Sequence, residues 1–458
     1  MAKPLRPKKR RTHAGRDTRL QNDLVGLWRQ LASSPNVPAL DRWLSRELRA
    51  LNGLRREQRL WLGDLLIDAV RFGALTVFCE EWRTAPVSAY IEPTERLQGW
   101  DDMSGPELWE RLRQLPVGVV FYWTFMRKRI EGAELPPVAA PDNRAGEIWR
   151  KVKDSGPISS DPAWRALWSG LPPRLVSPLV ARADNSGWSS GLLGRFCDRH
   201  STRPPLWLRL LDLDHRDDVE DELLAADLHV WSDDEALAVR GSFGIYELEC
   251  YREGLVEIQD RASQAIGEAV DVEPGHRVWD CCAGAGGKTL QMATDLAGEG
   301  MVLATDVHTG RLKDLQKRVK RAGLAEVQID RWDGREAPDL APKIIRKGQF
   351  DRVLVDAPCS GSGTWRRHPD GKLRFEAEQL AELTALQLDL LKRAAAAVRP
   401  GGNLVYATCS WFVEENEGVV ARFLEEVPRY ELVSTAMHGQ PDIDSDTTFV
   451  AVLQRAGE

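Results

Sequence analysis

The 458-residue sequence contains no CxxC pair and no apolar run long enough to span a membrane. Its seven cysteines are odd in number and widely scattered, which argues against a disulfide framework and against a structural zinc site. The N-terminus lacks the apolar core of a signal peptide. These absences predict a cytoplasmic protein without a metal, in which some cysteines are available as reactive thiols.

An excess of positive charge is also missing, because the formal net charge is −7. A polyanionic partner would therefore have to be met by local basic clusters. One cluster, Lys8-Lys9-Arg10-Arg11, lies in a polar tail, for which an RNA-binding arm, a nuclear address and an inert segment all remain open. A second cluster lies beside Trp365, for which an RNA contact and a solvated surface remain open; it consists of Arg366, Arg367, His368, Lys372 and Arg374.

The length predicts two or three domains. Apolar residues recur with helical spacing from about residue 24 to residue 82. A later segment alternates strand and helix signals, with strands expected at 206–210, 237–239 and 245–250 and a helix at 216–226. The predicted organisation is a basic disordered tail over 1–22, a helical domain over 23–163, a linker helix and small α/β module over 164–265, and a larger α/β domain over 266–458.

The larger domain is predicted to be a doubly wound, mainly parallel sheet, because strands and helices alternate along it. Its expected strands are 277–281, 301–305, 326–330, 352–356, 403–407 and 448–453. Ligands of such sheets bind beyond the carboxyl ends of the strands. Polar or thiol side chains follow five of these strands, namely Cys282, Asp306, Asp333, Asp356 with Cys359, and Cys409.

A glycine-rich turn, Cys282-Ala283-Gly284-Ala285-Gly286-Gly287-Lys288, joins the first of these strands to an amphipathic helix. A phosphate-binding P-loop would need glycine where the chain has Cys282. The dinucleotide fingerprint would need glycine where the chain has Thr289. The turn therefore suits close approach of a ligand without matching either phosphate-binding pattern.

Two aspartates complete the expected ligand site. Asp306 follows the second strand, where an acidic residue accepts the hydroxyls of a ribose, and Asp333 is placed to reach a purine edge. A loop or helix-cap role is the alternative for each of them. Taken together with the glycine turn, they favour S-adenosylmethionine over ATP or NAD as the cofactor.

Cys359 and Cys409 follow two strands that should lie close together in the sheet. Burial as structural cysteines is the alternative to a chemical role. Beside a sulfonium cofactor and Lys288, these thiols are expected to ionise and act as nucleophiles. A methyl donor combined with a nucleophilic thiol suggests methylation of a carbon that needs activation, such as C5 of a pyrimidine.

At this point the motifs resemble those of the bacterial RsmB and eukaryotic Nop/Sun family of RNA cytosine-C5 methyltransferases. The resemblance extends from about Pro205 to the C-terminus. Its motifs are Gln259–Gln264, Asp280–Thr289, Asp356–Gly363 with Arg366–Asp370, and Tyr406–Ser410 with Glu414–Asn416. The chain departs from the family where it has Gly284-Ala285 in place of Ala-Pro and Val413 in place of Pro.

The resemblance implies a Rossmann-like class I methyltransferase domain, an RRM-like module before it and a helical N-terminal domain similar to NusB. It implies that Cys409 adds to C6 of cytosine, that Cys359 assists release, and that Asp356 hydrogen-bonds the cytosine edge. The residues that it implies for S-adenosylmethionine are Cys282, Ala283, Gly284, Ala285, Gly286, Gly287, Lys288, Asp306, Asp333 and Asp356. The implied partner is unpaired RNA, expected to be ribosomal. A transfer-RNA substrate and a catalytically inactive assembly factor are the alternatives.

Overall fold

The computed structural model describes residues 18–86, 97, 100, 102–156, 161–241, 244–334 and 350–457. The cluster Lys8-Lys9-Arg10-Arg11 lies outside these residues. The chain forms two compact units, one of residues 1–176 with 368–374 and the other of residues 177–367 with 375–458. Within the described ranges, no helix combines the length and the apolarity needed to cross a bilayer.

The first unit is helical and is built around tryptophans. Its helices are α1 (Thr18–Ala32), α2 (Leu40–Ala50), α3 (Arg56–Arg71), α4 (Gly73–Thr84), α6 (Gly105–Gln114), α7 (Val117–Ile130), α8 (Asn143–Ser155), α9 (Pro162–Trp168) and α18 (Gly371–Arg374). Trp28, Trp109 and Trp123 are each 1% exposed in its core. Ser104 caps α6 by accepting a hydrogen bond from the backbone N–H of Glu107. Burial of the indoles makes them core residues rather than platforms for nucleobases.

The second unit begins with α10 (Val176–Asn185) and α11 (Ser190–Arg199) and continues into a small α/β module. The module is an antiparallel sheet in the order β2 (His229–Asp233), β3 (Ala236–Arg240), β1 (Leu206–Leu210) and β4 (Val256–Ile258). Helix α12 (Arg216–Ala225) buries Val219 and Leu223 against one face of the sheet, together with Leu208 and Leu237. Strands β2 and β4 were not predicted from the sequence.

The strand predicted at 245–250 is wrong. The segment forms a short 3₁₀ turn, η5 (Ile245–Glu247), followed by the helix α13 (Glu249–Arg252). The carboxylate of Glu222, on α12, accepts hydrogen bonds from the backbone N–H groups of Glu249 at 2.6 Å and Cys250 at 2.9 Å. These bonds satisfy the first N–H groups of α13, so a contact from a distant residue stabilises a helix over the local strand-like pattern.

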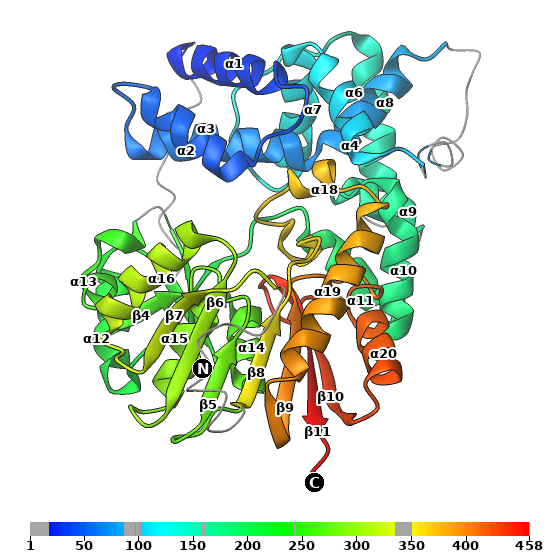
Figure 1. Ribbon diagram of the computed structural model, residues 1–458. Helices are drawn as coiled ribbons and strands as arrows, with labels where there is room; N and C mark the ends of the chain where they lie inside the picture. The colour runs from blue at the N-terminus through cyan, green and yellow to red at the C-terminus, as the bar shows by residue number, and fades with distance from the viewer. Residues whose placement is uncertain are drawn as a thin grey trace. The chain divides into compact units, whose positions relative to one another are not determined.

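The larger sheet confirms the predicted doubly wound fold (Figure 1). Its strand order is β10 (Tyr430–Gly439), β11 (Thr447–Arg455), β9 (Val398–Thr408), β8 (Phe350–Asp356), β5 (Arg277–Asp280), β6 (Met301–Asp306) and β7 (Val327–Arg331). The pairs from β9 to β7 are parallel, whereas β11 pairs antiparallel with both β9 and β10. The central strands are apolar on both sides, which is expected for a sheet covered on both faces.

Helices cover the two faces of this sheet. The helices α19 (Gln379–Ala395) and α20 (Glu417–Glu426) pack on one face, and α14 (Arg261–Val270), α15 (Gly287–Asp295) and α16 (Thr309–Ala322) pack on the other. Alternate residues of β8 show the two layers, since Val353 and Val355 face α19 while Leu354 faces α14 and α15. This arrangement brings the carboxyl ends of the parallel strands to one rim.

Candidate active site

A cavity of about 740 Å³ opens at the rim of the parallel strands. Its volume is within the range of pockets that hold small-molecule ligands. All of the site residues predicted from the sequence line it, namely Cys282, Ala283, Gly284, Ala285, Gly286, Gly287, Lys288, Asp306, Asp333, Asp356, Cys359 and Cys409. The tertiary structure therefore brings together five segments that lie apart in the sequence.

The glycine turn is held in place by Asp306. The Oδ2 atom of Asp306 accepts a hydrogen bond from the backbone N–H of Gly284 at 2.9 Å, and Oδ1 accepts one from His308 at 2.7 Å. Gly286 begins α15 with a φ of 92°, and a Cβ atom there would lie 2.1 Å from the Leu315 side chain. A glycine at this position is thus required by packing, while the open space around Gly284 leaves backbone available to a ligand.

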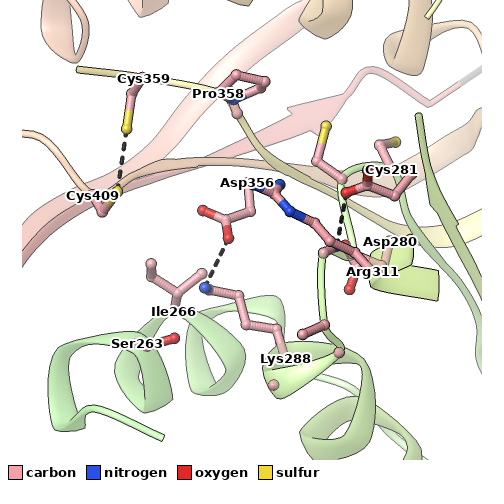
Figure 2. Close-up of a pocket in the computed structure, with 18 of the residues that line it drawn as sticks. Ser263, Ile266, Asp280, Cys281, Lys288, Arg311, Asp356, Pro358, Cys359 and Cys409 are labelled. Carbon is pink, nitrogen blue, oxygen red and sulfur yellow. Dashed lines mark hydrogen bonds and ion pairs between the residues drawn. The ribbon is translucent and has the colours of Figure 1, made fainter. Parts of the chain in front are cut away.

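Lys288 and Asp356 form an ion pair inside the cavity, with 2.8 Å between Nζ and Oδ2 (Figure 2). Burial is the largest single influence and would lower the pKa of Lys288, but the charge of Asp356, its hydrogen bond and the charges of Asp280 and Cys409 together outweigh burial and raise the pKa of Lys288. Asp280 lies nearby and accepts a hydrogen bond from Thr289. Burial, reinforced by the charge of Asp356, raises the pKa of Asp280 to about 7. Lys288 is therefore a fixed cation beside carboxylates that repel one another.

Cys359 and Cys409 lie at the ends of the adjacent strands β8 and β9, as predicted. Their Sγ atoms point toward each other at 3.3 Å, and both cysteines are free thiols (Figure 2). The hydrogen bond with Cys409 and then burial raise the pKa of Cys359 well above its ordinary range. This shift disfavours a Cys359 thiolate, because its negative charge would lie next to a second sulfur in a buried place. Ionisation beside the sulfonium cofactor stays a prediction.

The sequence analysis missed several residues that line the cavity. Arg311 lies in the first turn of α16, and Ser263 and Ile266 come from α14. Asp260 and Asp446 also contribute to the lining. A signal for Arg311 was present in the sequence, since it lies one helical turn beyond the strand-ending Asp306. The contribution of Asp446 had no local signal, because it comes from the loop that follows the unpredicted strand β10.

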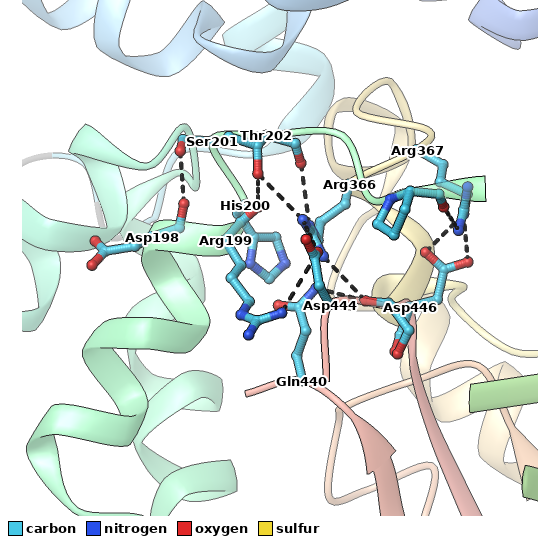
Figure 3. Close-up of polar contacts among 12 residues, drawn as sticks. Asp198, Arg199, His200, Ser201, Thr202, Arg366, Arg367, Gln440, Asp444 and Asp446 are labelled. Atoms are coloured by element: carbon cyan, nitrogen blue, oxygen red, sulfur yellow. Dashed lines mark hydrogen bonds and ion pairs between the residues drawn. The ribbon is translucent and has the colours of Figure 1, made fainter. Parts of the chain in front are cut away.

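Two members of the second basic cluster, Arg366 and Arg367, are occupied by acidic partners (Figure 3). Arg366 is 1% exposed and forms an ion pair with Asp444 at 2.8 Å. Arg367 pairs with Asp260 at 2.6 Å and with Asp446 at 2.9 Å. Burial and the neighbouring Asp260 raise the pKa of Asp446 to about 7, against the opposing charge of Arg367. These arginines neutralise buried carboxylates that are distant in sequence, so both open interpretations of this pair as exposed residues are wrong.

Trp365 and Lys372 are also buried, whereas Arg374 is exposed. Trp365 packs against Phe375 and Trp411 and is 2% exposed. The ammonium group of Lys372 donates to the backbone oxygens of Arg71 and Gly170 within the helical unit. Burial lowers the pKa of Lys372 well below its ordinary value. Neutral hydrogen-bond partners of this kind give Lys372 a structural role.

Comparison with known proteins identifies the domain that contains the cavity. The sequence profile of the family described as 16S rRNA methyltransferase RsmB/F matches residues 268–454. The chain carries a methyltransferase domain of the RsmB/F family. The cofactor of such a domain is S-adenosylmethionine, as the sequence predicted.

Individual relatives agree with this family. The ribosomal RNA small subunit methyltransferase B of Klebsiella pneumoniae is 35% identical over 248 residues, which cover 53% of this chain and 56% of the relative. The enzyme of the same name from Salmonella paratyphi C is 34% identical over 252 residues, covering 54% and 57%. The matched part of the chain thus spans little more than half the length of these curated relatives.

Solved structures show the same fold. The crystal structure of PH0851 superposes on 98% of this chain and 100% of its own, with a TM-score of 0.67 at 21% identity. NSun6 from Pyrococcus horikoshii, solved with SFG, covers 61% of this chain and 98% of its own, with a TM-score of 0.53 at 17% identity.

Proposed function

We propose that this protein transfers a methyl group from S-adenosylmethionine to C5 of a cytosine in RNA, through a covalent bond between Cys409 and C6. Ribosomal RNA is the proposed substrate, in keeping with the names of the relatives. The observation that carries the proposal is the pair of thiols, 3.3 Å apart, in the same cavity as the Lys288–Asp356 ion pair and the glycine turn.

The residues present fit the cofactor. The open backbone at Gly284 and the carboxylates of Asp306 and Asp333 suit a nucleoside with free hydroxyls, because carboxylates accept hydrogen bonds from hydroxyl groups. Each oxygen of Asp306 already accepts one backbone N–H and retains a second lone pair. When bound, S-adenosylmethionine supplies an electrophilic methyl group. The residues proposed to hold it are 282–288, Asp306, Asp333 and Asp356.

The proposed chemistry assigns one role to each reacting side chain. The thiolate of Cys409 adds to C6 of cytosine, which gives C5 the electron density of an enamine carbon. Asp356 hydrogen-bonds the cytosine edge around N3 and N4 and stabilises the adduct, while Lys288 holds the Asp356 carboxylate in place. After methylation, Cys359 in its thiolate form takes the C5 proton, the electron pair of the C–H bond forms the C5–C6 double bond, and Cys409 leaves as a thiolate. Cys359 assists this release from a distance of 3.3 Å.

Bisulfite sequencing of total RNA tests the proposal, with a strain that lacks the protein compared with its parent. We expect one or a few ribosomal cytosines to lose their protection, and to regain it when the wild-type protein is restored. Loss of protection in transfer RNA would instead favour the transfer-RNA alternative. Unchanged protection in every RNA would refute the proposed activity. The presence of Cys409, Cys359, Asp356 and Lys288 together argues against an inactive assembly factor.

The other parts of the chain keep their proposed assignments. Residues 23–163 are proposed as a NusB-like RNA-binding domain, and 164–265 as a linker helix with an RRM-like module. Helix α1 begins at Thr18, inside the predicted tail of residues 1–22.

An RNA partner is supported by the charge of α16. This helix carries six basic residues and one acidic residue, although the whole chain has a net charge of −7. Lys313, Lys317 and Lys320 are exposed along one face of the helix, and Arg311 at its start lines the cavity. The spacing of the lysines places successive charges about 4.5–6 Å apart along the helix axis, which forms a continuous basic stripe. We therefore propose that RNA leaving the cavity follows this face.

Replacing Lys313, Lys317 and Lys320 by glutamine should weaken RNA binding and flatten its salt dependence. Loss of three phosphate contacts to single-stranded RNA lowers the slope of log K against log salt by about two. Filter-binding titrations over a series of salt concentrations measure this slope. The matched control replaces three cations on the opposite face of the sheet, Lys392, Arg393 and Arg422. Equal slopes for the two triple variants would contradict a path along α16.

A further inference from the structure

A fully buried carboxylate lies directly behind the loop that carries Cys359. Glu415 is 0% exposed. Its Oε1 atom accepts hydrogen bonds from the backbone N–H of Ser360 at 2.8 Å and from Nε2 of Gln387 at 3.0 Å, and Oε2 accepts one from the Ser360 hydroxyl at 2.6 Å. Nε2 of Gln387 also donates to the backbone oxygen of Pro358 at 2.9 Å. Glu415 thus holds Ser360 directly, and Gln387, which donates to both Glu415 and Pro358, links Glu415 to the other side of Cys359.

The next residue fixes the other thiol. The Asn416 side chain accepts a hydrogen bond from the Thr408 hydroxyl at 2.6 Å and donates to the backbone oxygen of Ser410 at 3.0 Å. Thr408 and Ser410 are the two neighbours of Cys409. Asn416 is 0% exposed, so water does not compete for these bonds. The consecutive side chains of Glu415 and Asn416 therefore form hydrogen bonds next to Cys359 and next to Cys409, respectively.

The segment that carries these two side chains is itself anchored to the sheet. The Tyr406 hydroxyl donates to the backbone oxygen of Glu415 at 2.5 Å. The backbone N–H of Gly363 donates to the backbone oxygen of Cys409 at 3.0 Å, which ties the Cys359 loop to the end of β9 directly. A Cβ atom on Gly363 would lie 1.9 Å from the backbone oxygen of Thr447, so the loop also packs tightly against β11. The separation of the thiols is thus set by several connected bonds.

We propose that Glu415 and Asn416 are a positioning pair that sets the geometry of the two thiols, Glu415 for Cys359 and Asn416 for Cys409. The inference rests on the proposed function. Burying a carboxylate beside neutral donors is costly, and well-packed apolar side chains would stabilise the fold at least as well. A costly buried group in contact with a reactive loop indicates a role in the chemistry of that loop.

The negative charge of Glu415 also affects the protonation of Cys359. The pKa of Cys359 is raised first by its hydrogen bond with Cys409, then by burial, and further by the negative charges of Cys409 and Glu415. Glu415 therefore favours the protonated form of Cys359. A protonated Cys359 leaves Cys409 as the thiol that adds to the base, which is the order proposed above.

Replacing Glu415 by alanine tests the inference. The Cys359 loop then loses its anchor while Cys409 keeps its own, so methyl transfer in a single turnover should fall by less than about tenfold, whereas release of product slows much more. A covalent protein–RNA adduct carrying a labelled methyl group should then accumulate on a denaturing gel. Glu415→Gln keeps an acceptor for the Ser360 N–H and should largely restore release. Because the amide lacks charge, the rise of the release rate with pH should move to lower pH in this variant.

The adjacent Glu414 provides the matched control, since it is exposed and has the same chemistry. Glu414→Gln should release product at the wild-type rate. Asn416→Ala should act on the other thiol and reduce adduct formation rather than release. The inference is overturned if Glu415→Ala releases product at the wild-type rate, or if Glu414→Gln accumulates the adduct to the same extent.

Two further measurements keep these outcomes distinct. Circular dichroism establishes whether Glu415→Ala folds. If it does not fold, Ser360→Ala replaces it, because this change removes only the hydroxyl donor and should accumulate the same adduct. Release of product by Ser360→Ala at the wild-type rate would again overturn the inference. Cys359→Ser serves as the reference for a trapped adduct. If that variant traps no methylated RNA, the proposed function fails; if it does and the Glu415 variants do not, only the positioning role fails.

Discussion

Replacing Cys409 by serine should abolish methyl transfer and leave no covalent protein–RNA complex. The proposed first step needs a thiolate, and a serine hydroxyl is far less ionised near neutral pH. Removing a nucleophile of this type lowers rates by roughly 10⁴-fold or more, which places the variant at the background of a labelled-methyl assay. A denaturing gel of enzyme incubated with RNA and methyl-labelled cofactor measures both quantities.

Cys359→Ser should behave in the opposite way on the same gel. Addition and methyl transfer precede the step that Cys359 assists, so a labelled adduct should accumulate and survive denaturation. Cys250→Ala is a suitable control, because Cys250 is buried in the small module away from the cavity. An adduct that forms with Cys409→Ser and is absent with Cys359→Ser would reverse the two assignments.

Asp356→Asn should lower the rate of methyl transfer by about 10²–10⁴-fold, the usual range for loss of a positioned acid–base group. The amide keeps the shape of the side chain but loses the charge that holds Lys288 and the hydrogen-bonding capacity proposed for the cytosine edge. Without that charge, burial is no longer offset and the pKa of Lys288 should fall. Single-turnover rates at saturating RNA and cofactor measure the effect on transfer.

Asp351 provides a matched control on the same strand. It lies at the other end of β8 and pairs with Arg399 at 2.6 Å, outside the cavity. Asp351→Asn should therefore transfer methyl groups at a rate close to that of the wild type. If Asp356→Asn stays within about threefold of wild type, Asp356 takes no direct part in the reaction.

Much of the methyltransferase fold was predictable from local sequence. Each of the strands β5, β6, β8 and β9 is an apolar run followed by a polar or thiol residue, and such runs are typical of parallel strands buried on both faces. The edge strand β10 was missed because the five consecutive residues from Glu431 to Thr435 are exposed, so burial does not alternate along the strand. A strand at an edge needs no apolar face on that side, so its sequence lacks the pattern used for prediction.

Charged residues were harder to interpret than the strands. Arg366 and Arg367 are adjacent cations in the sequence, and only the fold shows that Asp444, Asp446 and Asp260 neutralise them. The sequence did not mark the exposed lysines of α16 as a binding surface, because a charged face on a helix is usually only solvated. Arg311 at the start of the same helix lines the cavity, and this placement of the helix is what makes the lysines informative.

The sequence by itself determined the local features on which the proposed chemistry rests: a glycine turn without a phosphate-binding pattern, two aspartates after strands, and two cysteines at the ends of strands. These features are local, and their residue types alone restrict what they can bind or attack. Only the tertiary structure decided that the thiols face each other at 3.3 Å, that the pKa of Cys359 is raised, and that Glu415 and Asn416 hydrogen-bond the two loops. Distances, burial and hydrogen-bond partners depend on residues far apart in the chain, because each is set by packing of the whole domain.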